Sequence, residues 1–358
     1  IRGISLPPSG DNQPARVSQW IGPVEITVGY SSPDVHGPTG EDRTGKIWGQ
    51  LVPWGMSNLG FGTCGDQCPW RGGANENTTF SIDHDVQVQG KTLAAGTYGL
   101  HFLPGADEWT VIFSKNSTSW GSFSYDAKED ALRVTAKPTK GEFREWLTYD
   151  FTDRDADHAT LEMQWENLRL PIEITVPNLD ELYLAAIRRD LRTTPGFSWQ
   201  NWQAAATFCL QKKINLDEAL VWAKNAAELP GIGQENFNTV VTVARVEEAL
   251  GQTEQAKKTY DRAFALPSAQ PFDFHQLGRQ LLAEKKPAEA MRVFEANAHR
   301  FPKAWPIEVG LLRGHAALGN KAEALRHAKL ALAQAPDEAA KKNVEGLIAQ
   351  IEKGVAID

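Results

Sequence analysis

The residues best suited to chemistry lie close together in the segment CGDQCPWRGGANENTTF, residues 64–80. Cys64 and Cys68 enclose only Gly, Asp and Gln, and the remaining cysteine, Cys209, lies far away in the sequence. A zinc knuckle needs a second pair of ligands at matched spacing, and a thioredoxin-like redox pair has two intervening residues, not three. We therefore expect Cys64 and Cys68 to form a local disulfide that stabilises this loop, and Cys209 to be a buried free thiol.

The segment WRGGANENTT that follows the cysteines is the strongest candidate for a ligand cleft. Its small residues allow the backbone to approach a ligand closely. Arg71 offers a planar fork for a carboxylate, Asn75 both a donor and an acceptor, and Glu76 a carboxylate or general base. The alternative is structural: Arg71 pairs with Glu76 or another acid, and Asn75 satisfies backbone groups of the loop.

The first half of the chain holds four histidines: His36, His84, His101 and His158. Their spacing matches no i, i+2 or i, i+4 ligand pattern, so the sequence predicts no metal site. In YGLHFLP, His101 alternates with Leu100 and Phe102, which places it on the opposite face of a strand. We expect its side chain to face solvent or to be hydrogen-bonded, and we keep it as a fourth cleft candidate.

Catalytic motifs are missing from the sequence. It has no Gly-rich phosphate loop, no Gly-x-Ser-x-Gly elbow and no His-Glu-x-x-His zinc motif. We therefore predict no catalytic residue and no cofactor, and we favour a non-enzymatic protein over an enzyme. The net charge of −8 argues against a nucleic-acid-binding surface. No apolar run approaches the ~18–20 residues of a membrane span.

Two kinds of element must position the candidate residues. Between residues 16 and 176, polar and apolar residues alternate and turn residues interrupt the pattern, as in RVSQWIGPVEITVGY. Short, regularly spaced strands rich in Val, Ile, Thr and aromatic residues indicate an all-β sandwich or barrel. Eight of the twelve tryptophans precede residue 170, which suits a β core filled by aromatic side chains. We predict an antiparallel β-sandwich.

The pattern changes at Pro177, after which NLDELYLAAIRRDLRTT carries apolar residues at helical spacing behind an Asn cap. Four similar segments then start at Leu216, Thr253, Pro287 and Lys321, at offsets of 37, 34 and 34 residues. Each has Ala as its fourth residue and a Pro after the helix, and another helix precedes each. This pattern resembles the tetratricopeptide repeat over residues 199–338, with 337–353 as a capping helix. The alternative is a non-repetitive helical bundle.

The repeat resemblance implies a solenoid with a concave groove that binds a peptide or another protein. In paired-helix repeats the first helix of each pair lines the concave side. Aromatic anchors and amide groups there would suit an extended chain. The partner-binding candidates are Trp199, Trp202, Asn236, Asn238, Phe272 and His275. The alternative is that the aromatic residues are repeat core and the amides are solvated caps.

The first half also resembles a known family. The motifs ITVGYSSPDVHG, KIWGQLVPWG, WRGGANENTT, LAAGTYGLHFLPG, EWTVIFSKNSTSWGSFSYD and DALRVTAKP occur in this order. Together they resemble DUF2911, a bacterial domain of unknown function, over most of residues 16–176. The resemblance implies an exported protein, often with a helical-repeat tail, and no established reaction. The sequence departs from the family pattern in MSNLGFGTCGDQCP before Trp70 and in the loop PTGEDRTG.

We therefore expect four parts: an N-terminal extension (1–15), a β-sandwich domain (16–178), a linker helix (179–198) and a tetratricopeptide-like repeat domain (199–358). The chain starts at Ile1 with a polar, proline-bearing stretch, which is typical of a mature N-terminus left after removal of a leader. A truncated chain is the alternative. If a leader was removed, the protein is periplasmic or secreted, where a disulfide is permitted.

Two functions from different classes follow. The first is a non-enzymatic interaction or scaffold protein of the bacterial cell envelope. It would bind another protein or complex through the repeats and the β domain, as an accessory subunit of an envelope or membrane-bound assembly. The alternative is a small-ligand-binding protein or enzyme that uses a cleft near Arg71, Asn75 and Glu76. The lack of catalytic motifs, together with the solenoid, favours the first.

Overall fold

A computed structural model describes residues 12–37, 39–302 and 305–354 of the chain. The chain divides between Ala186 and Ile187 into two compact units, a β unit and a helical unit. No helix in the described ranges is both long enough and apolar enough to cross a membrane. The predicted N-terminal extension falls mostly outside these ranges. Its last residues belong to the first strand, which begins at Gln13.

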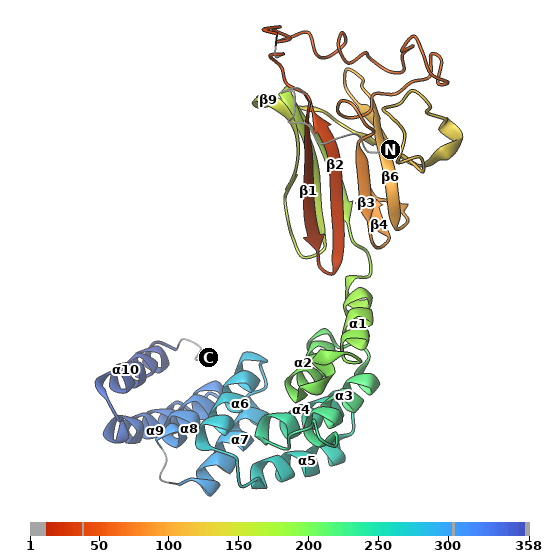
Figure 1. The fold of residues 1–358 in the computed structure, drawn as a ribbon. Helices are drawn as coiled ribbons and strands as arrows, with labels where there is room; N and C mark the ends of the chain where they lie inside the picture. Colours follow the sequence, from red (N-terminus) through yellow and green to blue (C-terminus); the bar gives the residue numbers. More distant parts are fainter. Residues whose placement is uncertain (1–11, 38, 303–304, 355–358) are drawn as a thin grey trace. The chain divides into compact units, whose positions relative to one another are not determined.

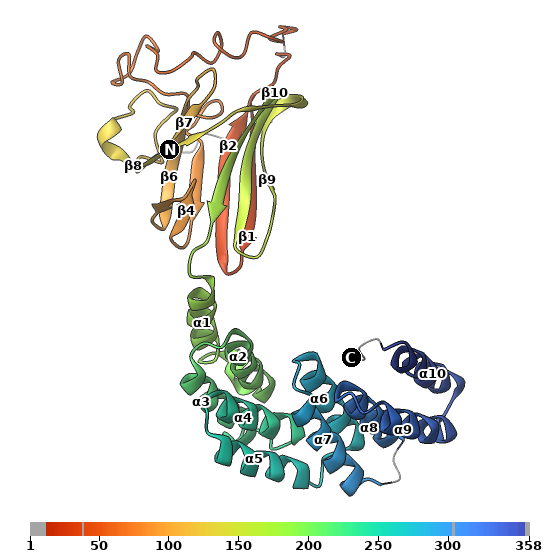
Figure 2. The same cartoon turned by 180° about the vertical axis from the view of Figure 1, so that it is seen from behind.

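The β unit contains two antiparallel sheets that face each other (Figure 1). The six-stranded sheet has the order β1-β2-β3-β6-β7-β8 and the four-stranded sheet the order β5-β4-β10-β9. The strands are β1 (Gln13–Ile21), β2 (Val24–Ser32), β3 (Thr79–Ile82), β4 (Val86–Val88), β5 (Lys91–Leu93), β6 (Gly96–Leu103), β7 (Trp109–Ser114), β8 (Asp130–Ala136), β9 (Thr139–Thr152) and β10 (His158–Thr175). Seen from behind, β9 and β10 lie in front of β1 and β2 (Figure 2). The predicted sandwich is confirmed.

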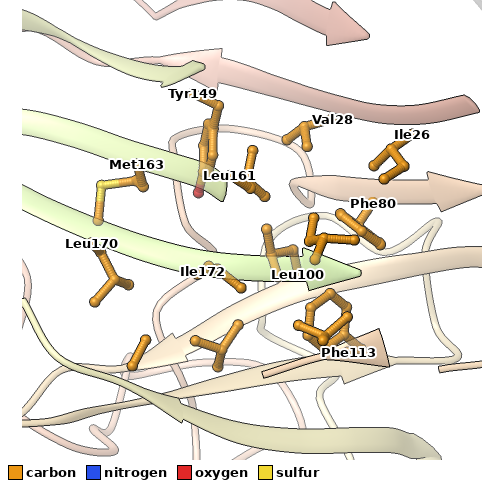
Figure 3. Close-up of a cluster of buried hydrophobic side chains, with 14 of the residues drawn as sticks. Ile26, Val28, Phe80, Leu100, Phe113, Tyr149, Leu161, Met163, Leu170 and Ile172 are labelled. Carbon is orange, nitrogen blue, oxygen red and sulfur yellow. The ribbon is translucent and has the colours of Figure 1, made fainter. Parts of the chain in front are cut away.

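Period-two alternation produces this sandwich because it gives each strand one apolar face. In β2, Val24, Ile26 and Val28 are fully buried, while the residues between them are only partly covered. Figure 3 shows Phe80 and Phe113 of the six-stranded sheet near side chains of β10 in the shared core. Burial of such a layer from both sheets is the main force that holds the β unit together.

Aromatic side chains fill one region of this core. The Trp48 ring contacts Trp70, Trp109 and Trp165 at centroid distances of 5.7, 5.1 and 5.7 Å, edge to face in each case. Edge-to-face packing is favourable because the positive edge of one ring meets the negative face of another. These four residues lie far apart in the sequence, so the cluster ties the loop around Trp48 to both sheets.

The helical unit consists of paired helices. The described α-helices are α1 (Leu179–Asp190), α2 (Trp199–Lys212), α3 (Leu216–Glu228), α4 (Phe237–Ala249), α5 (Thr253–Ala265), α6 (Pro271–Ala283), α7 (Pro287–Arg300), α8 (Pro306–Ala317), α9 (Lys321–Gln334) and α10 (Glu338–Lys353). The second helix of each pair, α3, α5, α7 or α9, begins at the residue that the repeat predicted. The tetratricopeptide-like architecture is confirmed, including a terminal helix over nearly the predicted residues.

The repeated small residues explain why the helices pair so closely. Ala219, Ala256, Ala290 and Ala324 are exposed by no more than 3%. Glycine has the same role farther along the stack, because a Cβ on Gly278 would lie 2.2 Å from the Phe294 ring. Small residues at these positions allow two helices to pack at short distance, and the space is filled by large neighbours.

The predicted linker helix, 179–198, is not a single separate element. It contains α1 and a short 3-10 turn at Thr194–Phe197. Leu179 and Leu182 at the start of α1 pack against the core of the β unit. The Cδ1 atom of Leu179 lies so close to Gly22 that any side chain there would clash, and Gly22 also has a φ of 57° in the β1–β2 turn. At the end of α1, Arg188 forms an ion pair with Glu218 of the helical unit at 2.6 Å.

This packing yields a testable prediction about where the β unit ends. A fragment of residues 1–186 should be more stable to unfolding than a fragment of residues 1–178 by about 2 kcal/mol, because two leucines remain partly buried on the core. Thermal and urea unfolding followed by circular dichroism would measure the difference. The double variant Leu179→Ala/Leu182→Ala of the longer fragment is the control and should unfold like the shorter one. Equal stability of the two unmodified fragments would contradict the role given to α1.

Candidate functional site

The Cys64–Cys68 pair lies in an insert that covers the outer face of the six-stranded sheet. The two cysteines form a disulfide with their Cα atoms 5.2 Å apart, which confirms the pairing expected from the sequence. Both are buried against Ile112 of β7 and Tyr125. Backbone hydrogen bonds of 3.1 Å between Ser57 and Cys68, one in each direction, join the two ends of the insert. The disulfide therefore fixes a loop that closes over β6 and β7.

His101 lies beneath this insert. Its side chain pairs across β6 and β7 with Ile112, is only 2% exposed, and packs edge-on against Tyr125 at 5.4 Å. Its Nδ1 atom has no hydrogen-bond partner among the described residues. The expectation of a solvent-facing or hydrogen-bonded His101 is therefore wrong, because the insert buries a strand face that would otherwise be open. Burial, helped by the positive charge of Arg71, lowers the pKa of His101 to about 4.

Arg71 supports a turn and does not pair with an acid. Its Nη1 donates to the carbonyl oxygen of Asn75 at 2.7 Å, and its guanidinium lies 4.7 Å from the centre of the Phe123 ring. No carboxylate of the described residues forms an ion pair with it, so the alternative of an Arg71–Glu76 pair is wrong. Burial lowers the pKa of Arg71. The hydrogen bond holds Asn75 in the left-handed conformation, with a φ of 56°.

Asn75 and Glu76 point to different surroundings. The Asn75 side chain accepts a hydrogen bond from Asn12 at 3.4 Å, whereas the exposed Glu76 accepts one from the Ser31 hydroxyl at 3.1 Å. A backbone hydrogen bond of 2.9 Å from Ala74 to Ser31 fixes the same turn to the end of β2. The structure therefore keeps Arg71 and Asn75 together and gives Glu76 a different partner.

A cleft of about 310 Å³ lies beside this turn. Arg71 and Asn75 line it, whereas Glu76 and His101 do not. Its other walls include Trp70 and Trp165, whose rings stack 6.3 Å apart, and Arg43. Arg43 is already paired with Glu41 at 2.7 Å and with Asp34 at 3.5 Å. Sequence reasoning missed Arg43 because the loop that carries it departs from the family pattern, and it missed Trp165 because a strand tryptophan reads as core.

In the helical unit, the first helices of the pairs form one side of the stack. In Figure 1, α4 and α6 lie on one side and α5 and α7 on the other. Helix α2 packs directly on α4, and α6 on α8. Within the described ranges, the second helices do not approach one another as closely. Helices α4 and α6 do not approach each other as closely as these two pairs, so the assignment of the first helices to a concave side stays a prediction.

Three of the six partner-binding candidates have structural partners. The Trp202 indole donates to the Gly196 carbonyl at 2.8 Å, which ties α2 to the turn before it. Asn236 caps α4, where it accepts from the Thr239 amide at 3.1 Å in a capping box. His275 is partly buried beside the Phe294 ring, and burial together with Arg313 and Arg279 lowers its pKa to about 4.

The side chains of the other three candidates are at least partly exposed. Asn238 is exposed at the start of α4, and Phe272 is 58% exposed at the equivalent position of α6. Trp199 begins α2 and is half-buried. Asn238 and Phe272 are 34 residues apart, so they occupy matching places in consecutive repeats. The role of these side chains in partner binding stays a prediction.

Arginines that recur with the repeat period are a feature that sequence reasoning missed. Arg245 of α4, Arg279 of α6 and Arg313 of α8 are each 34 residues apart, so they occupy the same position in three successive first helices. Arg245 forms an ion pair with Glu284, Arg279 is exposed, and Arg313 is buried, with 7% of its surface accessible. The signal was available, because a charged residue that recurs with the repeat period must recur on the same face.

Comparison with known proteins separates the two units. Residues 12–174 match the family model DUF2911. This match confirms the resemblance drawn from the sequence motifs. The family is described as a protein of unknown function, so any reaction of this domain stays open. The DUF2911 region includes both sheets, the disulfide insert and the 310 Å³ cleft. No curated protein matches the chain.

Solved structures that are similar to the chain include two that are described as tetratricopeptide repeat proteins. YrrB, a TPR protein with an unusual peptide-binding site, is 16% identical, with a TM-score of 0.26 over 47% of this chain and 84% of its own. A tetratricopeptide repeat protein from Parabacteroides merdae is 15% identical, with a TM-score of 0.29 over 49% of this chain and 71% of its own. MamA from Desulfovibrio magneticus is 15% identical, with a TM-score of 0.25 over 43% of this chain and 93% of its own.

Burial of His101 predicts a pH-dependent stability of the DUF2911 region. The unfolded chain binds a proton at His101 below pH 6.5, but the folded chain binds it only near pH 4. Since the unfolded state holds more protons in this window, the free energy of unfolding should fall by about 3 kcal/mol as the pH drops from 6.5 to 4.

Urea unfolding at several pH values, followed by near-ultraviolet circular dichroism, would measure this loss. His101→Gln should flatten the curve over that window, while His84→Gln, at a side chain that is 41% exposed, should leave it unchanged. An unaltered slope in His101→Gln would show that other groups cause the acid sensitivity.

Proposed function

We propose that the protein is a protein-interaction module whose repeat unit binds an extended, acidic segment of another protein along the first helices. The observation that supports this is the exposed Arg279 of α6, which shares its repeat position with the mostly buried Arg245 and the buried Arg313. A peptide that runs along a solenoid meets equivalent positions of successive repeats, so an exposed positive charge at one of them favours a negative charge on the peptide.

The electrostatic surroundings of Arg279 also favour an anionic partner. Burial, helped by the positive charges of Arg313 and Arg279, lowers the pKa of His275 to about 4, so its imidazole is neutral near pH 7 and adds no charge beside Arg279. Arg245 has Glu284 as an internal partner and Arg313 is buried with contacts of its own, so Arg279 is the arginine most open to a partner. The exposed Phe272 ring at the start of α6 supplies an apolar contact on the same helix as Arg279. Together these groups suit a segment that combines carboxylates with an apolar side chain.

The disulfide supports an exported location for this interaction. A disulfide persists in the periplasm or outside the cell and is rare in a reducing cytoplasm. The bond between Cys64 and Cys68 lies in a buried insert, where it stabilises a covering loop. We therefore place the partner in the cell envelope or outside the cell, as a component of an envelope assembly.

Charge reversal at Arg279 tests the proposed interaction. A library of fluorescent peptides with acidic, neutral and basic versions of each sequence would be titrated against the full chain. Acidic peptides should bind best, and Arg279→Glu should weaken them by at least about tenfold, or ~1.4 kcal/mol, through like-charge repulsion. Binding should also weaken with added salt.

The matched control is Arg292→Glu, an exposed arginine on α7, a second helix. It should leave both peptide affinity and melting temperature unchanged. Asn238→Ala should weaken binding by a smaller factor, since it removes an amide contact but no charge. If acidic peptides bind no better than basic ones, or if both charge reversals act equally, the first-helix face is not the binding surface.

The cleft of the DUF2911 region supports a second candidate function, the binding of a small organic anion. Its volume of about 310 Å³ lies at the lower end of the range for small-molecule sites. Its walls combine two tryptophans with the guanidinium of Arg71, which has no carboxylate partner among the described residues. A planar carboxylate would meet a bidentate donor and aromatic walls there.

Ligand-observed NMR with carboxylates and their matching amides would test the cleft. Carboxylates should bind and amides should not, and Arg71→Lys should weaken the carboxylates by about tenfold because lysine keeps the charge but loses the planar fork. Arg16→Gln, at an exposed residue of β1, is the control. Equal binding of carboxylates and amides would exclude recognition by Arg71.

A further inference from the structure

A group of metal-ligand side chains joins the last two helices of the repeat. His315 lies near the end of α8, and Glu323 and His327 lie four residues apart on α9. Their ligand atoms all lie within 4.8 Å of one another. Residues at i and i+4 share one face of a helix, so Glu323 and His327 face the same neighbour, and that neighbour is α8.

The hydrogen bonds of His327 leave one ring nitrogen suited to a metal. Its Nδ1 lies 2.7 Å from a carboxylate oxygen of Glu308, and its Nε2 lies 2.7 Å from Nη2 of Arg326. A guanidinium can only donate, so Nε2 accepts and Nδ1 carries the proton that it donates to Glu308. A carboxylate that receives the second N–H of a histidine is the arrangement that orients metal-binding imidazoles.

A cationic side chain already lies among these ligands. The Arg326 guanidinium bridges His327 and Glu323, with its Nε 2.8 Å from the Glu323 carboxylate. Arg326 and Glu323 are both about half exposed, so the guanidinium can leave for solvent without opening the core. On the other side, the buried Nδ1 of His315 has no hydrogen-bond partner among the described residues. The His315 and His327 rings are nearly parallel, 5.3 Å apart.

We propose that His315, Glu323 and His327 form a zinc site in which the metal ion takes the place of the Arg326 guanidinium. Two imidazoles and one carboxylate are a ligand set that zinc prefers, with water as the fourth ligand. Ligands in a tetrahedral zinc site lie about 3.3 Å apart, a distance that rotation of the exposed Glu323 and a small movement of His315 can reach. The bound ion would link α8 to α9 and stabilise the end of the solenoid.

This site was missed in the sequence because only the histidines of the first half were compared for ligand spacing. The Glu-x-x-x-His pattern of residues 323–327 carries the i, i+4 signal in the sequence itself. The contribution of His315 depends on how α8 packs on α9. The proposed site is independent of the peptide-binding function, because its residues lie outside the row formed by Arg245, Arg279 and Arg313.

Zinc titration of the chelator-treated full chain, in competition with a chromophoric chelator, tests the proposal. The wild type should bind one zinc ion, and His315→Ala and His327→Ala should each weaken binding at least about tenfold, with Glu308→Gln weakening it by a similar factor through His327. His299→Ala, at an exposed histidine of α7, is the matched control and should bind zinc like the wild type.

Arg326→Gln gives an opposite and more specific result. Removal of the competing cation should tighten zinc binding by about tenfold, and zinc should raise the melting temperature of this variant more than that of the wild type. Since this variant gains affinity, a folding defect cannot mimic the result. The proposal is overturned if the two histidine variants, folded by circular dichroism, bind zinc as the wild type does. It is also overturned if Arg326→Gln binds no more tightly.

Discussion

Close contact between paired helices at four buried alanines is the constraint on which the helical unit depends. Ala219, Ala256, Ala290 and Ala324 let each second helix lie against its neighbours, and a larger side chain at any of them would separate the pair. Each repeat needs a small residue where its two helices cross, so the spacing of these alanines sets the period of the whole stack. Any other side chain that recurs with that period then recurs on one face, which is how three arginines come to form a row.

The β unit meets a different constraint, since its six-stranded sheet is covered on both faces. The second sheet covers the inner face, and the disulfide insert covers the outer face of β6 and β7. This second cover has a cost. It buries His101, whose Nδ1 finds no partner among the described residues, and an unpaired polar group in an apolar site lowers stability. The same insert supplies part of the cleft wall, so protection of the sheet and formation of the cleft follow from one element.

Local patterns in the sequence were sufficient for most of the fold. Period-two alternation predicted the sandwich, the 34-residue repeat predicted where the second helices start, and the short cysteine spacing predicted the disulfide. Each of these features depends on residues close together in the sequence, or on repetition, and both can be read without knowledge of tertiary contacts. The resemblance to DUF2911 was also carried by short local motifs.

The candidate site was predicted less well because its properties depend on distant contacts. Alternation placed His101 opposite Leu100, but only the folded insert decides that this face is buried. Asn236 and Asn238 are two residues apart and chemically identical, yet one caps α4 and the other is exposed. The difference arises from where α4 begins, and helix boundaries are the least certain feature of a sequence pattern. The Arg71 guanidinium contacts a backbone carbonyl oxygen and an aromatic ring, whereas the sequence suggested a carboxylate partner.

Internal partners of the charged groups determine how strongly this protein can bind anything. Arg245 is already paired with Glu284, so an acidic partner must displace that carboxylate, and the gain is the difference between two similar interactions. Arg279 is exposed and forms no ion pair with any residue in the described ranges, so contact with an acidic partner gives a full new interaction there. Since the chain as a whole has a net charge of −8, long-range attraction of an acidic partner is weak and selection falls to this local charge. The proposed binding should therefore be moderate in strength, sensitive to salt and concentrated at Arg279, as expected of a reversible contact with an extended chain.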